Sequence, residues 1–82
     1  SQMNAETQRT NGLQMLDFAM RRVARSKTSV TLAIDKVQAY TVIQTLGVVG
    51  VISEDESEDY SKKLDQKILE VQRSFDSASL TS

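Results

Sequence analysis

The 82-residue chain contains no cysteine and no histidine. Without cysteine, it can form neither a disulfide nor a thiolate metal site. Without histidine, it lacks the commonest general base and the commonest ligand of transition metals. Catalysis would then depend on other side chains set in a pocket, which so short a helical chain rarely forms. We therefore expect a protein that is not an enzyme and that binds no cofactor and no metal.

A charge excess is also absent, since ten basic side chains stand against eleven acidic ones and the net charge is −1. The total therefore indicates neither a nucleic acid nor a basic partner. No apolar run near the N-terminus resembles a signal peptide, and polar residues interrupt the most apolar segment. We expect a cytoplasmic protein without membrane contact. Ser1 and Gln2, which precede Met3, are interpreted as a cloning remnant.

The length allows one small domain. A chain of this size buries only about 60–65% of the surface that its unfolded form exposes, so a lone monomer is marginally stable. With disulfides and thiolate metal sites excluded, association of copies is the remaining source of stability. We therefore expect a homo-oligomer.

Composition divides the chain into a polar start, a patterned middle and a small polar end. We predict a disordered N-terminal tail over residues 1–10, one helical domain over 11–75 and a flexible C-terminal tail over 76–82.

The first predicted helix begins at Asn11, which we expect to cap it beside Gly12. Apolar residues then recur at spacings of three and four as far as about Arg25, which is typical of an amphipathic helix. The apolar stripe consists of Leu13, Leu16, Met20 and Val23, widened by Phe18 and Ala19.

The segment from residue 29 onward fits two structures. Apolar and small or polar residues alternate over 29–34, which indicates a short strand followed by two helices. The same residues also fit a helix that Ser29 caps and that continues to Leu46, and the length of the segment favours this helix. Gly47 is then predicted as the left-handed residue that ends it.

Residues 37–53 carry no charge, and 14 of the 23 residues in 30–52 are apolar. Such a segment predicts a buried central helix, followed by a buried turn over residues 47–52.

The third predicted helix, from about residue 54 to 74, has the clearest pattern. Ser53 and Glu56 have the spacing of a capping box at its start. One narrow apolar seam follows, with the spacing that packs along another helix, and we assign it to the contact between copies. The seam consists of Tyr60, Leu64, Ile68, Val71 and Phe75.

Five carboxylates lie within six residues at the start of this helix. The helix dipole stabilises acids there, but five exceed what capping requires, because like charges one turn apart repel. We interpret them as a surface for a basic partner protein. This acidic patch consists of Glu54, Asp55, Glu56, Glu58 and Asp59.

Four basic side chains end the first predicted helix, where the dipole favours positive charge. They are also candidates for nucleic-acid contact through phosphates. This basic cluster consists of Arg21, Arg22, Arg25 and Lys27.

Together these patterns predict an all-α fold, a small three-helix domain that forms an oligomeric bundle. The function we expect is a non-enzymatic protein–protein interaction module, which binds itself and an unidentified protein through helix packing and the acidic patch. Two alternatives stay open. One is a DNA-binding regulator that uses the basic cluster. The other is a small phage-type inhibitor that occupies a basic nucleic-acid cleft of a host enzyme.

Overall fold

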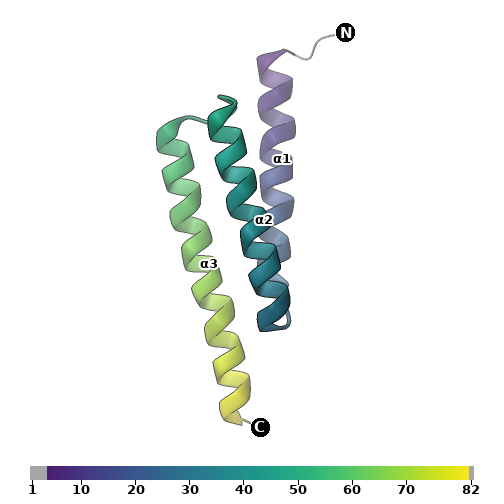
Figure 1. The fold of residues 1–82 in the computed structure, drawn as a ribbon, viewed down its shortest axis with the longest axis vertical. Helices are drawn as coiled ribbons and strands as arrows, with labels where there is room; N and C mark the ends of the chain where they lie inside the picture. Colours follow the sequence, from purple (N-terminus) through teal and green to yellow (C-terminus); the bar gives the residue numbers. More distant parts are fainter. Residues whose placement is uncertain (1–3, 82) are drawn as a thin grey trace.

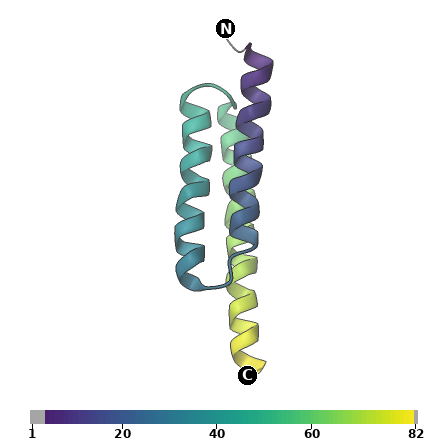
Figure 2. The ribbon, with the colours of Figure 1, turned by 90° about the vertical axis from the view of Figure 1, so that its right-hand side faces the viewer.

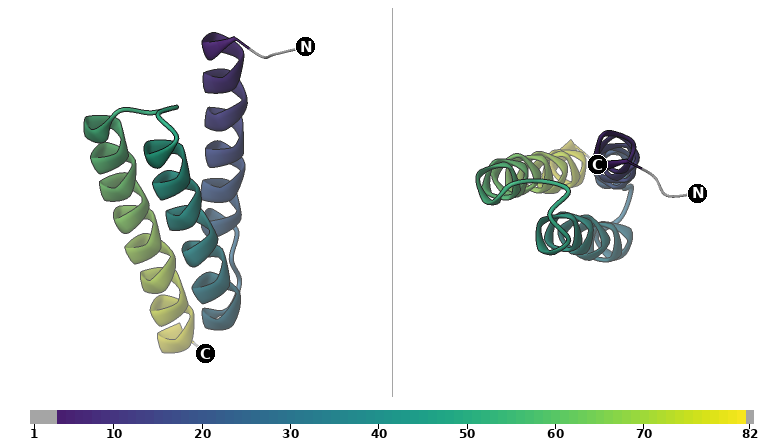
Figure 3. Two further views of the ribbon diagram at one scale, coloured as in Figure 1. Left: turned by 45° about the horizontal axis from the view of Figure 1, so that its top comes forward. Right: turned by 90° about the horizontal axis from the view of Figure 1, so that it is seen from above.

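Three α-helices form the molecule in the computed structural model, which describes the backbone of residues 4–81 and the side chains of residues 4–77. They are α1 (Ala5–Ala24), α2 (Ser29–Val48) and α3 (Glu54–Thr81). Each runs antiparallel to its neighbour in the chain (Figures 1 and 2), and from above the three lie at the corners of a triangle (Figure 3). The predicted all-α, three-helix class is confirmed. Residues 29–34 form the first turns of α2, not a strand.

Helix α1 begins earlier than the sequence pattern predicted. Asn4 caps it, since its Oδ1 accepts a hydrogen bond from the Thr7 backbone N–H at 2.8 Å. Asn11 therefore lies inside the helix and is not its cap. The predicted tail is wrong for residues 5–10, which are polar because they form an exposed part of α1. Residues 1–3, including the interpreted cloning remnant, lie outside the described part of the chain.

Gly12 lies where α1 approaches the connection between α2 and α3. A Cβ atom at this position would lie 2.8 Å from Val51 Cγ1 and 2.9 Å from Leu46 Cδ2. Both distances are shorter than van der Waals contact, so only glycine fits without displacing its neighbours. Gly12, which we expected beside the cap of the first helix, is thus a buried helical glycine.

The cap of helix α2 lies one residue before the predicted cap. The Thr28 side chain accepts a hydrogen bond from the Thr31 N–H at 3.1 Å, and Thr31 Oγ1 in turn accepts one from the Thr28 N–H at 3.3 Å. This reciprocal pair is a capping box. Ser29, the predicted cap, is the first helical residue.

Gly50, not Gly47, provides the left-handed residue after α2, with φ +78°. The Gly50 N–H bonds to the Gly47 carbonyl at 3.2 Å and the Val51 N–H to the Leu46 carbonyl at 2.9 Å, the two bonds of a Schellman motif. Gly47 has a packing role instead, because a Cβ there would lie 2.7 Å from Ser57 Oγ.

Helix α3 packs against both other helices and closes the core. Its predicted seam is confirmed as its apolar face: Leu64 is completely buried, and Ile68 and Val71 are nearly so. The predicted tail is wrong for residues 76–81, which continue α3 to Thr81. The core consists of Leu16, Ala19, Val23, Leu32, Ala39, Ile43, Leu46, Ile52, Leu64, Ile68 and Val71.

Candidate interaction surface

The side of α2 that faces away from the core is apolar and exposed. Because an α-helix turns once every 3.6 residues, positions 30, 34, 37, 41, 44 and 48 lie along one line on its surface. Core residues of the same helix, among them Leu32 and Ile43, lie on the opposite side. Along the line, exposure is 70% for Val30, 61% for Ile34, 62% for Val37 and 81% for Val48. We call this line the outer face of α2: Val30, Ile34, Val37, Thr41, Gln44 and Val48.

This finding corrects the prediction for residues 30–52. The segment was expected to be a buried helix and a buried turn, yet one side of α2 is exposed and so is Val49 in the turn. Ile52 alone among the turn residues is buried. A helix of a small bundle needs only one side for its own core, so the second apolar side of α2 remains outside.

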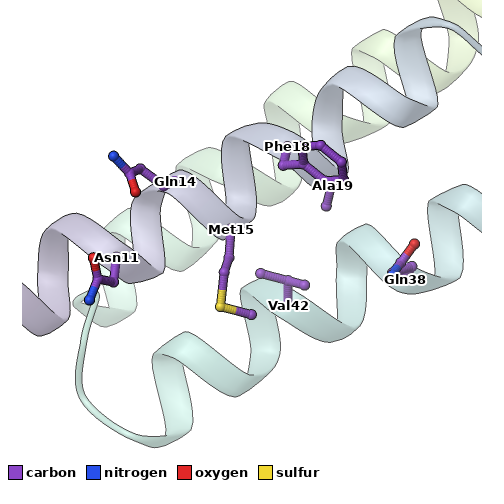
Figure 4. A pocket seen from close by; sticks show the side chains of 7 residues that line it. All are labelled: Asn11, Gln14, Met15, Phe18, Ala19, Gln38 and Val42. Carbon is purple, nitrogen blue, oxygen red and sulfur yellow. The ribbon is translucent and has the colours of Figure 1, made fainter.

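A shallow groove of about 460 Å³ separates α1 from α2 beside this face. Met15 extends from α1 towards Val42 on α2, and Phe18 lies one turn further along (Figure 4). Met15 is 59% exposed and Phe18 is 65% exposed. Phe18 therefore does not belong to the buried stripe of α1, as the sequence pattern suggested, but borders an apolar surface.

Four of the five residues in the predicted acidic patch are exposed, and Glu56 is half-buried. Glu58 forms an ion pair with Lys62 at 3.3 Å, on the surface of α3. Glu54 lines a second shallow hollow together with Gln44 and Val48. The acidic patch thus reaches the edge of the outer face of α2.

Glu56 has contacts inside the chain that set it apart from the rest of the patch. Its Oε1 accepts the Ser53 N–H at 2.9 Å, and the Ser53 hydroxyl accepts the Glu56 N–H at 3.1 Å, so the predicted capping box is confirmed. Arg9 binds both carboxylate oxygens, at 3.1 and 2.6 Å, and also donates to the Val51 carbonyl at 3.3 Å. These contacts tie α1 to the start of α3.

The bonds from Arg9, followed by those from Ser53, lower the pKa of Glu56 to about 2. The same pairing raises the pKa of Arg9. Glu56 therefore stays ionised and bonded over the ordinary pH range, and it stabilises the chain's own fold.

Two members of the predicted basic cluster are paired within the chain. Arg21 contacts Asp17 at 2.9 Å on the surface of α1, and Arg22 lies 3.7 Å from Asp35 of α2. Asp35 also accepts a hydrogen bond from the buried Ser26 at 2.8 Å, so this group joins the ends of two helices. Arg25 and Lys27 are exposed at the same end of the bundle.

The predicted oligomer seam is used within one chain. Leu64, Ile68 and Val71 contribute to the core between the three helices, and Tyr60 and Phe75 pack partly buried against it. The assignment of this seam to a contact between copies is therefore wrong, because a buried side chain is not accessible to a second copy. Exposed apolar side chains lie on α2 instead.

Tyr40 connects α2 to α3 by donating a hydrogen bond to Asp65. Partial burial, together with this bond, raises the pKa of Tyr40 to about 12. The tyrosine is thus a neutral structural donor on the side of α2 that adjoins α3.

Within the described residues, no three carboxylates gather in a way that would hold a metal ion. None of the three helices, over the same residues, is both long and apolar enough to cross a membrane.

The sequence pattern contained the signal for the outer face of α2, since the spacings of four, three, four, three and four are visible in the chain. It was missed because the segment was read as apolar on all sides. The Arg9–Glu56 pair joins residues 47 positions apart, and no local pattern indicates it.

Comparisons with protein-family models, with curated proteins and with solved structures give no match for this chain.

Proposed function

We propose that this chain acts in the cytoplasm as a non-enzymatic protein–protein interaction module, which associates with itself and with a second protein. It uses helix packing on the outer face of α2 and the exposed carboxylates at the start of α3. One observation carries the proposal: the outer face presents four large aliphatic side chains to solvent in a line, with no charge among its six residues. Extended exposed apolar surfaces mark sites of association.

Burial of the outer face of α2 supplies enough free energy for binding. Full burial of an aliphatic side chain stabilises by about 1.5–3 kcal/mol. Val30, Ile34, Val37 and Val48 are 61–81% exposed. Covering all four would therefore contribute roughly 4–8 kcal/mol from this chain alone. A partner with a similar face adds a comparable amount, which can exceed the cost of about 4–15 kcal/mol for association.

The exposed acids fit the rim of such an interface. Glu54 borders the outer face of α2, and Asp55 and Asp59 are exposed on the same first turns of α3. Charges at the rim of an interface steer association and select the partner more than they add affinity. A basic surface on the second protein is the complement we propose for them.

The DNA-binding alternative has less support, because Arg21 and Arg22 already have carboxylate partners within the chain. The inhibitor alternative explains only the acidic patch. It assigns no role to the outer face of α2.

The test compares Val37→Glu with Leu69→Glu, each in a tagged chain. Both positions are exposed, but Leu69 lies on α3. The proposal predicts that Val37→Glu loses association with itself, while Leu69→Glu keeps it. Equal binding by the wild type and Val37→Glu would refute the proposal.

A second pair of variants tests the acidic residues. Reversing Glu54, Asp55 and Asp59 to lysine should weaken capture of the second protein, whereas reversing Arg21 and Arg25 to glutamate should not. Glu56 is left unchanged, because it supports the fold through Arg9. If only the basic variant loses the second protein, the binding face is the end of α1.

A further inference from the structure

The outer face of α2 has the spacing of a coiled-coil seam along the whole helix. Its six positions alternate between steps of four and three residues, and none is charged. A helix that packs on such a seam needs apolar or small polar side chains at the same spacing. The exposed sides of α1 and α3 do not meet this need, because charged residues such as Arg21 and Lys62 are spread over them. The outer face of α2 meets it.

We propose that the occupant of this face is α2 of a second copy, packed antiparallel about a two-fold axis. The inference rests on the proposed function and specifies one of its partners. In this dimer the same surface is used twice, as in any two-fold interface.

The spacing sets a symmetric register for the antiparallel pair. Val30 faces Val48 of the second copy, and Val37 faces Thr41 of the second copy. The polar positions are Thr41, which faces Val37, and Gln44, which faces Ile34, and polar residues inside a seam fix register. This register covers the full face of both copies.

Charge at the ends of the bundle selects the antiparallel orientation. Arg25 and Lys27 lie just before α2, and Glu54 and Asp55 lie just after it, so the two signs lie at opposite ends of α2 (Figure 1). An antiparallel dimer places each basic end beside the acidic end of the other copy. A parallel dimer places like charges together, which repel. Raising the salt concentration should therefore weaken the antiparallel dimer, because salt screens exposed charges.

Cysteine cross-linking tests the orientation without interference, because the chain has no cysteine of its own. The variants are Val30→Cys and Val48→Cys, each alone and mixed, with Leu69→Cys as the control on α3. All three positions are exposed, so the fold should tolerate the changes. Oxidation is followed by non-reducing gel electrophoresis, with one variant carrying a size tag.

The antiparallel register predicts a mixed disulfide between the two variants and none within either variant alone. Positions 30 and 48 are about 27 Å apart along the helix, and a disulfide needs Cα atoms within about 7 Å. Disulfides within each variant alone would show a parallel dimer and overturn the inference. A wild-type mass of one chain at high concentration would also overturn it. That mass would also overturn the self-association in the proposed function, whereas disulfides within each variant alone would overturn only the antiparallel arrangement.

Discussion

Replacing Leu64 by alanine removes a side chain from the centre of the core, where it is 0% exposed. Leucine-to-alanine changes at such sites cost about 2–5 kcal/mol, because apolar contact is lost and a cavity remains. An 82-residue domain has a total stability of about 4–12 kcal/mol. We expect Leu64→Ala to lose a large part of it, which corresponds to a fall in Tm of roughly 10–30 °C.

Leu69 provides a matched control, since it is the same residue type on the same helix but is 45% exposed. Leu69→Ala should cost less than about 1 kcal/mol, as surface changes usually do, and alanine favours the helix. Urea denaturation followed by circular dichroism measures both variants, and the slope with urea should stay unchanged. Equal losses at the two positions would refute the assignment of Leu64 to the core.

Three further changes have defined outcomes. Ile68→Asp places a charge at an 8% exposed core position and should unfold the chain at room temperature, as circular dichroism would show. Gly12→Val should lower Tm, because its side chain collides with Val51 and Leu46; an unchanged Tm would mean that these helices separate easily. Glu56→Gln should be less stable than the wild type at neutral pH. Because the fold lowers the pKa of Glu56 from 4.5 to about 2, this difference is full above about pH 4.5 and disappears as pH falls to about 2, in acid titrations of both proteins.

Sequence patterns predicted the structure correctly where they fitted only one structural element. The capping box of Ser53 and Glu56 joins neighbouring residues, so their spacing alone placed the start of α3. The apolar side of α3 likewise followed from the spacing of Leu64, Ile68 and Val71, because charged residues occupy the other side.

Sequence patterns gave a wrong position where two residues of the same type could each cap or end the same helix. Asn4 and Asn11 both suit a helix cap, and Gly47 and Gly50 both suit a helix end. The fold decides between them through contacts that are distant in sequence, such as the approach of Ser57 to Gly47.

Helix α2 shows a different limit of sequence reasoning. Both sides of this helix are apolar, so periodicity cannot tell which side faces the core. The bundle places Leu32 and Ile43 inside and leaves Val37 outside. Sequence reasoning assigned the contact between copies to the apolar side of α3, which is buried, and the exposed apolar side belongs to α2.

The most direct measurement of the central claim is the mass of the wild type and of Val37→Glu, by light scattering across the same dilution series. Glutamate suits an exposed helical position, so the variant should keep its helix content as a monomer. The account predicts a mass of two chains for the wild type at micromolar concentration and of one chain for Val37→Glu. Equal masses for the two proteins at every concentration would contradict it.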